Sequence, residues 1–166
     1  MNTNQITRPV LHINHFANQQ ALRLPTKEDR FTAAKAATTA LVLIRGLPGS
    51  GKSTMASVLV MVGYKHFEAD MFFEIDGIYR YDATRIREAH DWCKHMTRDA
   101  LSRGENVVVS NTFTRVNEMA PYLEMGAGKI RVIEAKGTWE NSHGVPRQMV
   151  DRMAARWELF PTAASI

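Results

Sequence analysis

The sequence predicts an α/β fold, namely a three-layer α/β/α sandwich around a parallel sheet. Short aliphatic runs typical of buried strands alternate along the chain with segments of helical periodicity. Strands joined by helices pair in parallel, and the helices cover both faces of the sheet. The chain has 166 residues, of which 45% are hydrophobic and 23% charged, and this size and composition suit one globular domain.

The predicted domain spans residues 39–160. It follows an N-terminal extension of residues 1–38, which is rich in Asn, Gln and Thr and ends in an alanine-rich stretch. Within this extension Thr26 resembles a helix N-cap, so a short helix is expected over residues 29–37. Residues 161–166 are expected to form a C-terminal tail.

Four strands are expected in the domain. The first is the glycine-bounded run ALVLIRG at 40–46, and the others are YKHFEAD at 64–70, NVVVSN at 106–111 and KIRVIEA at 129–135. Because parallel strands bring their carboxyl ends to one edge of the sheet, polar residues that follow these strands are expected to meet there.

Two helices are expected between these strands. The first covers residues 52–63 and stops at Gly63. The second covers residues 83–104, where apolar residues recur at helical spacing. Asp82 can cap its start, and Gly104 provides its end.

Two further helices are expected later in the chain. Thr114 is expected to cap a helix over residues 115–125, and Pro146 to lie in the first turn of a helix over residues 146–159. The Asp-Gly pair at 76–77 is typical of a turn.

A phosphate-binding loop, RGLPGSGKST, directly follows the first strand. Its glycines allow the backbone amides to converge on a phosphate, and the following helix presents its positive end. Lys52 can reach the β- and γ-phosphates, and the Ser53 hydroxyl can ligate magnesium. We therefore expect ATP and Mg²⁺ as cofactors, with the nucleotide bound by Gly46, Leu47, Pro48, Gly49, Ser50, Gly51, Lys52, Ser53 and Thr54.

Asp70 ends the second expected strand, at the same edge of the sheet as the phosphate-binding loop. An aspartate there can position a hydroxyl and accept its proton during phosphoryl transfer. The alternative is that Asp70 caps the turn that follows it. Asn111 and Thr112 leave the third strand at this edge too, and Asn111 is the candidate for orienting the acceptor.

Composition places the chain in a reducing cytoplasm. The single cysteine, Cys93, excludes an intrachain disulfide, and the first residues do not form a secretory signal. No apolar run is long enough to cross a membrane. The formal net charge is +4 and the isoelectric point about 9.4, which is compatible with an anionic partner such as nucleic acid.

From residue 40 to 158, six stretches resemble, in the same order, the P-loop polynucleotide-kinase-like proteins. They are RGLPGSGKST, EADMFF, YRYDATRIREAHDWC, VVVSNTFTRVNEMAPYLEM, TWENSHGVP and RMAARWE. This family includes bacteriophage polynucleotide 5'-kinases and kinase-like ATPase domains of some animal proteins. The resemblance implies a P-loop NTPase fold of the kinase type, with Asp70 as general base for a 5'-hydroxyl and Asn111 and Thr112 in the acceptor site.

The chain departs from the family pattern at three places. Phage enzymes tend to have an acidic residue where Asn111 stands, and an arginine shortly after the base, where this chain has Phe72 and Phe73. These two aromatic residues could stack an acceptor base or belong to the core. The segment between the fourth strand and the last helix is short, and it has no arginine before Arg147. Arg147 is therefore the first candidate for a catalytic cation and Arg115 the second.

Three functions remain open on the sequence. The favoured one is an ATP-dependent kinase for 5'-hydroxyl ends of nucleic acid. The second is a kinase of the same fold for another hydroxyl acceptor, such as a nucleoside or a hydroxymethylated base in DNA. The third is an ATP-binding switch protein with little catalytic activity. The oligomeric state cannot be read from the sequence.

Overall fold

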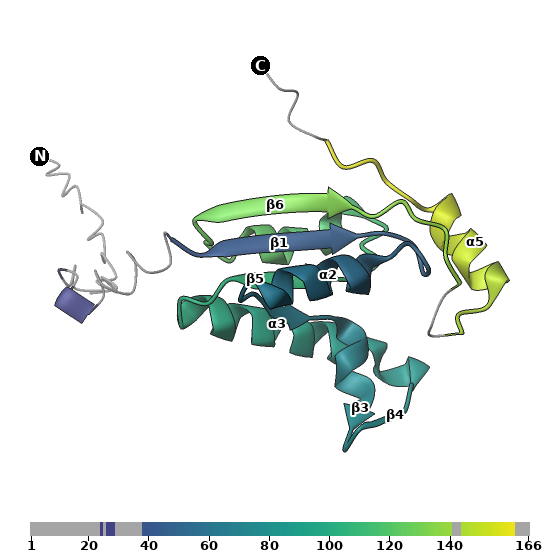
Figure 1. The fold of residues 1–166 in the computed structure, drawn as a ribbon, viewed down its shortest axis with the longest axis horizontal. Helices are drawn as coiled ribbons and strands as arrows, with labels where there is room; N and C mark the ends of the chain where they lie inside the picture. Colours follow the sequence, from purple (N-terminus) through teal and green to yellow (C-terminus); the bar gives the residue numbers. More distant parts are fainter. Residues whose placement is uncertain (1–23, 25, 29–37, 141–143, 162–166) are drawn as a thin grey trace, which may run out of the picture.

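The domain is built on a four-stranded sheet in which all strands are parallel, with the order β2-β5-β1-β6 (Figure 1). A computed structural model describes residues 24, 26–28, 38–140 and 144–161. The helix expected over residues 29–37 lies outside the described residues. The strands are β1 (Ala40–Arg45), β2 (Lys65–Phe67), β5 (Val107–Ser110) and β6 (Lys129–Glu134).

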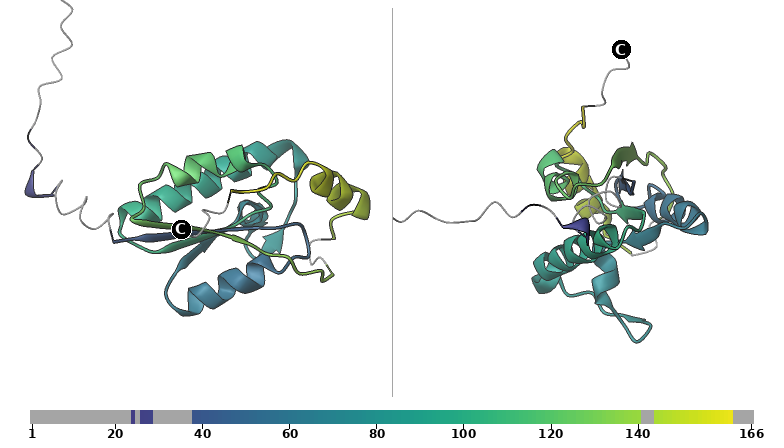
Figure 2. Two further views of the ribbon diagram at one scale, coloured as in Figure 1. Left: turned by 90° about the horizontal axis from the view of Figure 1, so that it is seen from above. Right: turned by 90° about the vertical axis from the view of Figure 1, so that its left-hand side faces the viewer.

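The helices cover both faces of the sheet, so the predicted α/β sandwich is confirmed. Helix α2 (Lys52–Met61) lies on one face, while α3 (Ile86–Ser102) and the short α4 (Ala120–Leu123) lie on the other (Figure 2). Within the described residues, no helix combines the length and apolar character needed to cross a membrane.

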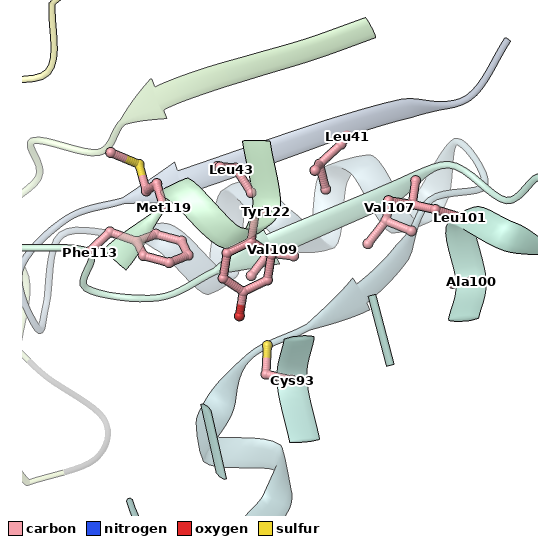
Figure 3. Packing of buried hydrophobic residues seen from close by; sticks show 10 residues of the cluster. All are labelled: Leu41, Leu43, Cys93, Ala100, Leu101, Val107, Val109, Phe113, Met119 and Tyr122. Carbon is pink, nitrogen blue, oxygen red and sulfur yellow. The ribbon is translucent and has the colours of Figure 1, made fainter. Parts of the chain in front are cut away.

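Alternation along β1 divides the core into two clusters. Leu41 and Leu43 pack on the side of α3 and α4, together with Val107, Val109 and Tyr122 (Figure 3). On the other face, Val42 and Ile44 pack with Ala56, Val108 and Ala135. β1 is buried because both of its faces are covered, as its uninterrupted aliphatic sequence predicts.

Between β2 and α3 the chain is less regular than the sequence predicts. β2 ends at Phe67, and Asp70 lies in a 3-10 helix, Ala69–Phe73. A hairpin of β3 (Glu74–Ile75) and β4 (Ile78–Tyr79) follows, and it projects away from the main sheet (Figure 1). The predicted turn at its tip is confirmed, since Asp76 and Gly77 have φ angles of 53° and 74°.

Two predicted helix caps differ in the structure. Asp82 accepts hydrogen bonds from the backbone and hydroxyl of Thr84, but it caps a 3-10 turn that precedes α3 rather than α3 itself. Thr114 was predicted to cap the next helix, and this is wrong because the cap of that 3-10 helix (Val116–Glu118) is Arg115. Thr114 is buried instead, and its carbonyl accepts from Glu158 N.

The last helix, α5 (Arg147–Ala155), lies beyond the carboxyl ends of the strands (Figure 1). Pro146 caps it, close to the predicted position. The chain then returns to the sheet, where the buried Arg45 guanidinium donates to the carbonyl of Glu158 at 2.7 Å and stacks on Trp157 at 4.0 Å. Arg45, at the end of β1, therefore binds the segment that follows α5.

Candidate active site

A pocket of about 610 Å³ lies at the carboxyl edge of the sheet, a volume that suits a small ligand such as a nucleotide. Segments that follow β1, β2, β4, β5 and β6 contribute to it, together with α3 and α5. It is lined by Pro48, Gly49, Gly51, Lys52, Ser53, Thr54, Glu68, Ala69, Asp70, Tyr79, Tyr81, Ile86, His90, Ser110, Asn111, Thr112, Trp139, Glu140, Gly144, Val145, Pro146, Met149, Met153 and Arg156.

The phosphate-binding loop joins β1 to α2 as predicted. Gly49 and Gly51 have φ angles of 79° and 87°, in the left-handed region that glycine adopts without strain. A Cβ at Gly46 would stand 2.8 Å from the carbonyl oxygen of Ala135, so close packing also requires glycine there. Of the nine loop residues predicted to bind the nucleotide, six line the pocket, and Gly46, Leu47 and Ser50 do not.

Trp139 holds the loop from the side of β6. Its backbone N–H donates to the carbonyl of Gly49 at 2.8 Å, and that of Gly137 donates to the carbonyl of Ser50. The indole ring lies so close to Gly51 that a Cβ there would stand 2.6 Å from Cζ3. Trp139 therefore limits the conformation of the loop, although 69% of the residue is exposed.

Lys52 begins α2 and faces two carboxylates in the pocket. Its ammonium donates to the carbonyl of Leu47 at 3.0 Å. Burial lowers the pKa of Lys52, while the charges of Glu68 and Asp70 act in the opposite direction. The ammonium is therefore only partly solvated and close enough to both carboxylates to interact with their charges.

Glu68 lies between the phosphate-binding loop and β5, and it was not predicted as a site residue. Its Oε2 accepts hydrogen bonds from Ser110 Oγ at 2.8 Å and from Ser53 Oγ at 3.2 Å. His66 Nε2 lies 2.7 Å from the same Ser110 hydroxyl. Burial lowers the pKa of His66, although the charge of Glu68 acts against this shift. The only signal in the sequence is that Glu68 directly follows β2.

Asp70 lines the pocket at the expected edge of the sheet, and its carboxylate acts on Tyr79. Burial raises the pKa of the Tyr79 hydroxyl, and the charge of Asp70 and a hydrogen bond with it raise this pKa further. Asn111 fixes the turn that carries Asp70, because its Oδ1 accepts from Ala69 N at 2.9 Å. Asn111 also donates to Cys93 Sγ at 3.7 Å. This buried side chain thus positions the backbone next to Asp70, and its predicted role in orienting the acceptor remains a prediction.

Besides Gly46, Leu47 and Ser50 of the loop, four residues proposed from the sequence for the acceptor or as catalytic cations do not line the pocket. Phe73 is 2% exposed and packs with Ala69 and Ala89, so it cannot stack an acceptor base. Phe72 contacts the core residues Phe73 and Trp92 and lies beneath the guanidinium of Arg85. The two predicted catalytic cations, Arg115 and Arg147, are both exposed on the surface. Arg147 also forms an ion pair with Asp151 at 3.0 Å.

Another arginine, Arg156, lines the pocket in their place. It ends α5, and its Nε donates to Thr114 Oγ1 at 3.1 Å. The sequence contained a signal for this side of α5. Helical spacing separates Met149, Met153 and Arg156, so these side chains are expected on one face.

The parallel sheet and the loop between β1 and α2 define the class: this is a P-loop protein with a kinase-like fold. The chain belongs to the AAA domain family, which matches residues 41–156.

Among known proteins, human NEDD4-binding protein 2 is 31% identical over 135 residues, which are 72% of this chain and 8% of that protein. The chain therefore spans only a small part of the length of this relative. A chain of the Pnkp1/Rnl/Hen1 complex has the same fold, with a TM-score of 0.51 and 16% identity over 78% of this chain and 43% of that one. A gluconokinase from Sinorhizobium meliloti 1021 has a TM-score of 0.46 and 18% identity, covering 74% of this chain and 76% of that one.

Proposed function

We propose that the protein transfers the γ-phosphate of ATP to the 5'-hydroxyl end of a nucleic acid. The observation that carries the proposal is that one pocket contains both the phosphate-binding loop with Lys52 and the carboxylate of Asp70. A phosphate donor and a hydroxyl acceptor can therefore meet inside it. The six stretches shared with the polynucleotide-kinase-like proteins and the AAA domain match support the same reaction class.

The loop has the features that a nucleoside triphosphate requires. Its conformation requires glycine at two positions, because a Cβ would meet the carbonyl of Ala135 at Gly46 and the ring of Trp139 at Gly51. The N-terminus of α2 opens onto the pocket, where its free N–H groups favour anionic ligands. Lys52 supplies a positive charge on its first turn.

Ser53 and Glu68 are the residues that would hold Mg²⁺. The two side chains already share a hydrogen bond, so both oxygens can face one cation. Among the described residues no cluster of three or more His, Cys, Asp or Glu side chains could bind a metal ion, so the remaining ligands would be phosphate oxygens and water. A bound Mg²⁺ would neutralise phosphate charge.

In the proposed reaction the acceptor hydroxyl oxygen forms a bond to the γ-phosphorus while the bond from that phosphorus to the β,γ-bridging oxygen breaks. ADP leaves with the electron pair, and Asp70 takes the hydroxyl proton. Tyr79 lines the pocket with Asp70, and the two side chains interact electrostatically. Arg156 would approach the transferred group from α5.

The test is incubation with γ-labelled ATP and magnesium against 5'-hydroxyl DNA, 5'-hydroxyl RNA, nucleosides and hydroxymethylated DNA. We expect label in the 5'-hydroxyl oligonucleotides. Asp70→Asn should keep near-normal ATP affinity and lose transfer by about 10²-fold or more, because the proton acceptor is removed. Lys52→Ala should strongly weaken ATP binding or transfer, because the charge facing the phosphates is lost.

The matched control for Asp70 is Asp76→Asn. Asp76 lies at the hairpin tip, outside the pocket lining, and asparagine also accepts its positive φ. If label appears only in nucleosides or in hydroxymethylated DNA, the acceptor is that molecule and not a 5'-hydroxyl end. ATP binding without transfer to any acceptor would identify a nucleotide-binding switch instead.

A further inference from the structure

Two tyrosines in the pocket have no role in the phosphate-binding loop. Tyr79 ends β4 and Tyr81 follows it, and both line the pocket although they are 44% and 56% exposed. They come from the hairpin segment that projects beyond the sheet (Figure 1). Large aromatic side chains that line a pocket and stay exposed offer flat apolar surface to a ligand.

The two rings are supported from the core. Phe73, which is 2% exposed, makes edge contacts with both, at ring-centroid distances of 5.2 Å to Tyr81 and 6.4 Å to Tyr79. Phe72 in turn packs against Phe73 at a ring-centroid distance of 5.4 Å. The sequence-based expectation of aromatic stacking therefore moves from the two phenylalanines to the two tyrosines that Phe73 contacts.

The charges in this part of the pocket do not favour a phosphate group. Of the described residues that line the pocket, the lysines and arginines are Lys52, in the phosphate-binding loop, and Arg156, on α5. The carboxylates of Asp70 and Glu68 act on the Tyr79 hydroxyl, and the same pocket lining contains Ile86 and His90. Burial lowers the pKa of His90, so its imidazole is neutral at pH 7. An uncharged planar group fits this surface better than an anion.

We propose that Tyr81, together with the ring of Tyr79, binds the base of the acceptor's terminal nucleoside and so selects acceptors that carry an aromatic heterocycle. This inference rests on the proposed kinase function and names the recognised part of its acceptor. Asp70 lines the same pocket as Tyr79 and Tyr81, so a base on these rings keeps its own 5'-hydroxyl in the pocket that holds the proton acceptor. The recognised unit is a nucleoside, either free or at the end of a chain.

The experiment compares an oligonucleotide that has an ordinary 5'-terminal nucleoside with one whose terminal sugar lacks its base. Binding is measured by fluorescence anisotropy of a 3'-labelled strand with Mg²⁺ and a non-hydrolysable ATP analogue, and KM and kcat are measured with ATP. We expect removal of the base to raise Kd and KM about tenfold for the wild type, the scale of one base stacked on an aromatic residue.

The variants are Tyr81→Ala, Tyr81→Phe and the control Ile75→Ala, an exposed hairpin residue outside the pocket lining. Tyr81→Ala should weaken binding of the base-bearing strand about tenfold and leave the abasic strand unchanged. The other two variants should behave as wild type. Adenosine, tested by calorimetry, distinguishes recognition of a free nucleoside from recognition of a strand end.

The inference is overturned if wild type binds both strands equally, if Tyr81→Ala weakens both equally, or if neither strand binds. Unchanged ATP affinity of Tyr81→Ala shows that the variant is folded. If that variant does not fold, the comparison of the two strands with wild type decides by itself. Base-dependent binding without phosphorylation would overturn the proposed function and support this inference.

Discussion

Gly51 is the residue at which the geometry of the phosphate-binding loop can be tested most directly. Its φ of 87° lies in the left-handed region, and a Cβ there would stand 2.6 Å from Cζ3 of Trp139. We therefore expect Gly51→Ala to be destabilised by two separate causes, the backbone conformation and displacement of the indole ring.

The size of each cause follows from the structure. Left-handed backbone costs a residue with a Cβ about 1–2 kcal/mol. About a third of Trp139 is covered, since 69% is exposed. At about 25 cal/mol per Å² and roughly 200 Å² for a buried tryptophan, loss of that contact costs about 1.5 kcal/mol. Gly51→Ala should therefore lower the free energy of unfolding by about 3 kcal/mol, and Trp139→Ala by about 1.5 kcal/mol.

Urea unfolding of both single variants and of the double variant measures the two causes. The contact between the Trp139 ring and the loop can be lost only once. The double variant should therefore be no less stable than Gly51→Ala, and its loss of unfolding free energy should be about 1.5 kcal/mol smaller than the sum of the two single losses. The control is Gly63→Ala, with a φ of 95° and no atom within 4 Å of its added Cβ, which should lose only the backbone term. Additive costs, or equal losses for Gly51→Ala and Gly63→Ala, would refute this explanation.

Two more predictions follow from the pocket and from β2. Arg156→Ala should lower phosphoryl transfer about a hundredfold with ATP still bound, because Arg156 lines the pocket. Arg147→Ala should stay active, because the Arg147 side chain is 89% exposed. The reverse result would favour Arg147, the cation inferred from the sequence. The lowered pKa of His66 means that the unfolded chain binds more protons below pH 6.5, so stability should fall with decreasing pH by up to about 1.4 kcal/mol per pH unit. Urea unfolding from pH 7.5 to 5 should show a smaller slope for His66→Gln than for wild type, and equal slopes would contradict this cause.

The parts of the fold that the sequence predicts well are those whose signals are local. The aliphatic run of β1 and the glycine pattern after it describe a buried strand and a loop whose conformation the loop's own glycines determine. The position of Asp70 beside this loop also follows, because parallel strands end at one edge.

The side chains that complete the pocket depend on contacts that the sequence does not display. The burial of Phe72 and Phe73 depends on the backbone conformation of the segment after β2. This segment forms a 3-10 helix, which places the Phe73 side chain in the core. Arg147 begins α5 and Arg156 caps its end, and only the docking of α5 decides which of them faces the pocket.

The hydrogen bond between Arg45 and Glu158 has a consequence for how the protein folds. It joins residues 113 positions apart, and one of them, Arg45, ends β1 where the phosphate-binding loop begins. Contacts between distant residues require costly loop closure and form slowly. We therefore expect Arg45 to reach its final contacts late in folding, so a nucleotide that binds the finished loop should slow unfolding while leaving the folding rate almost unchanged.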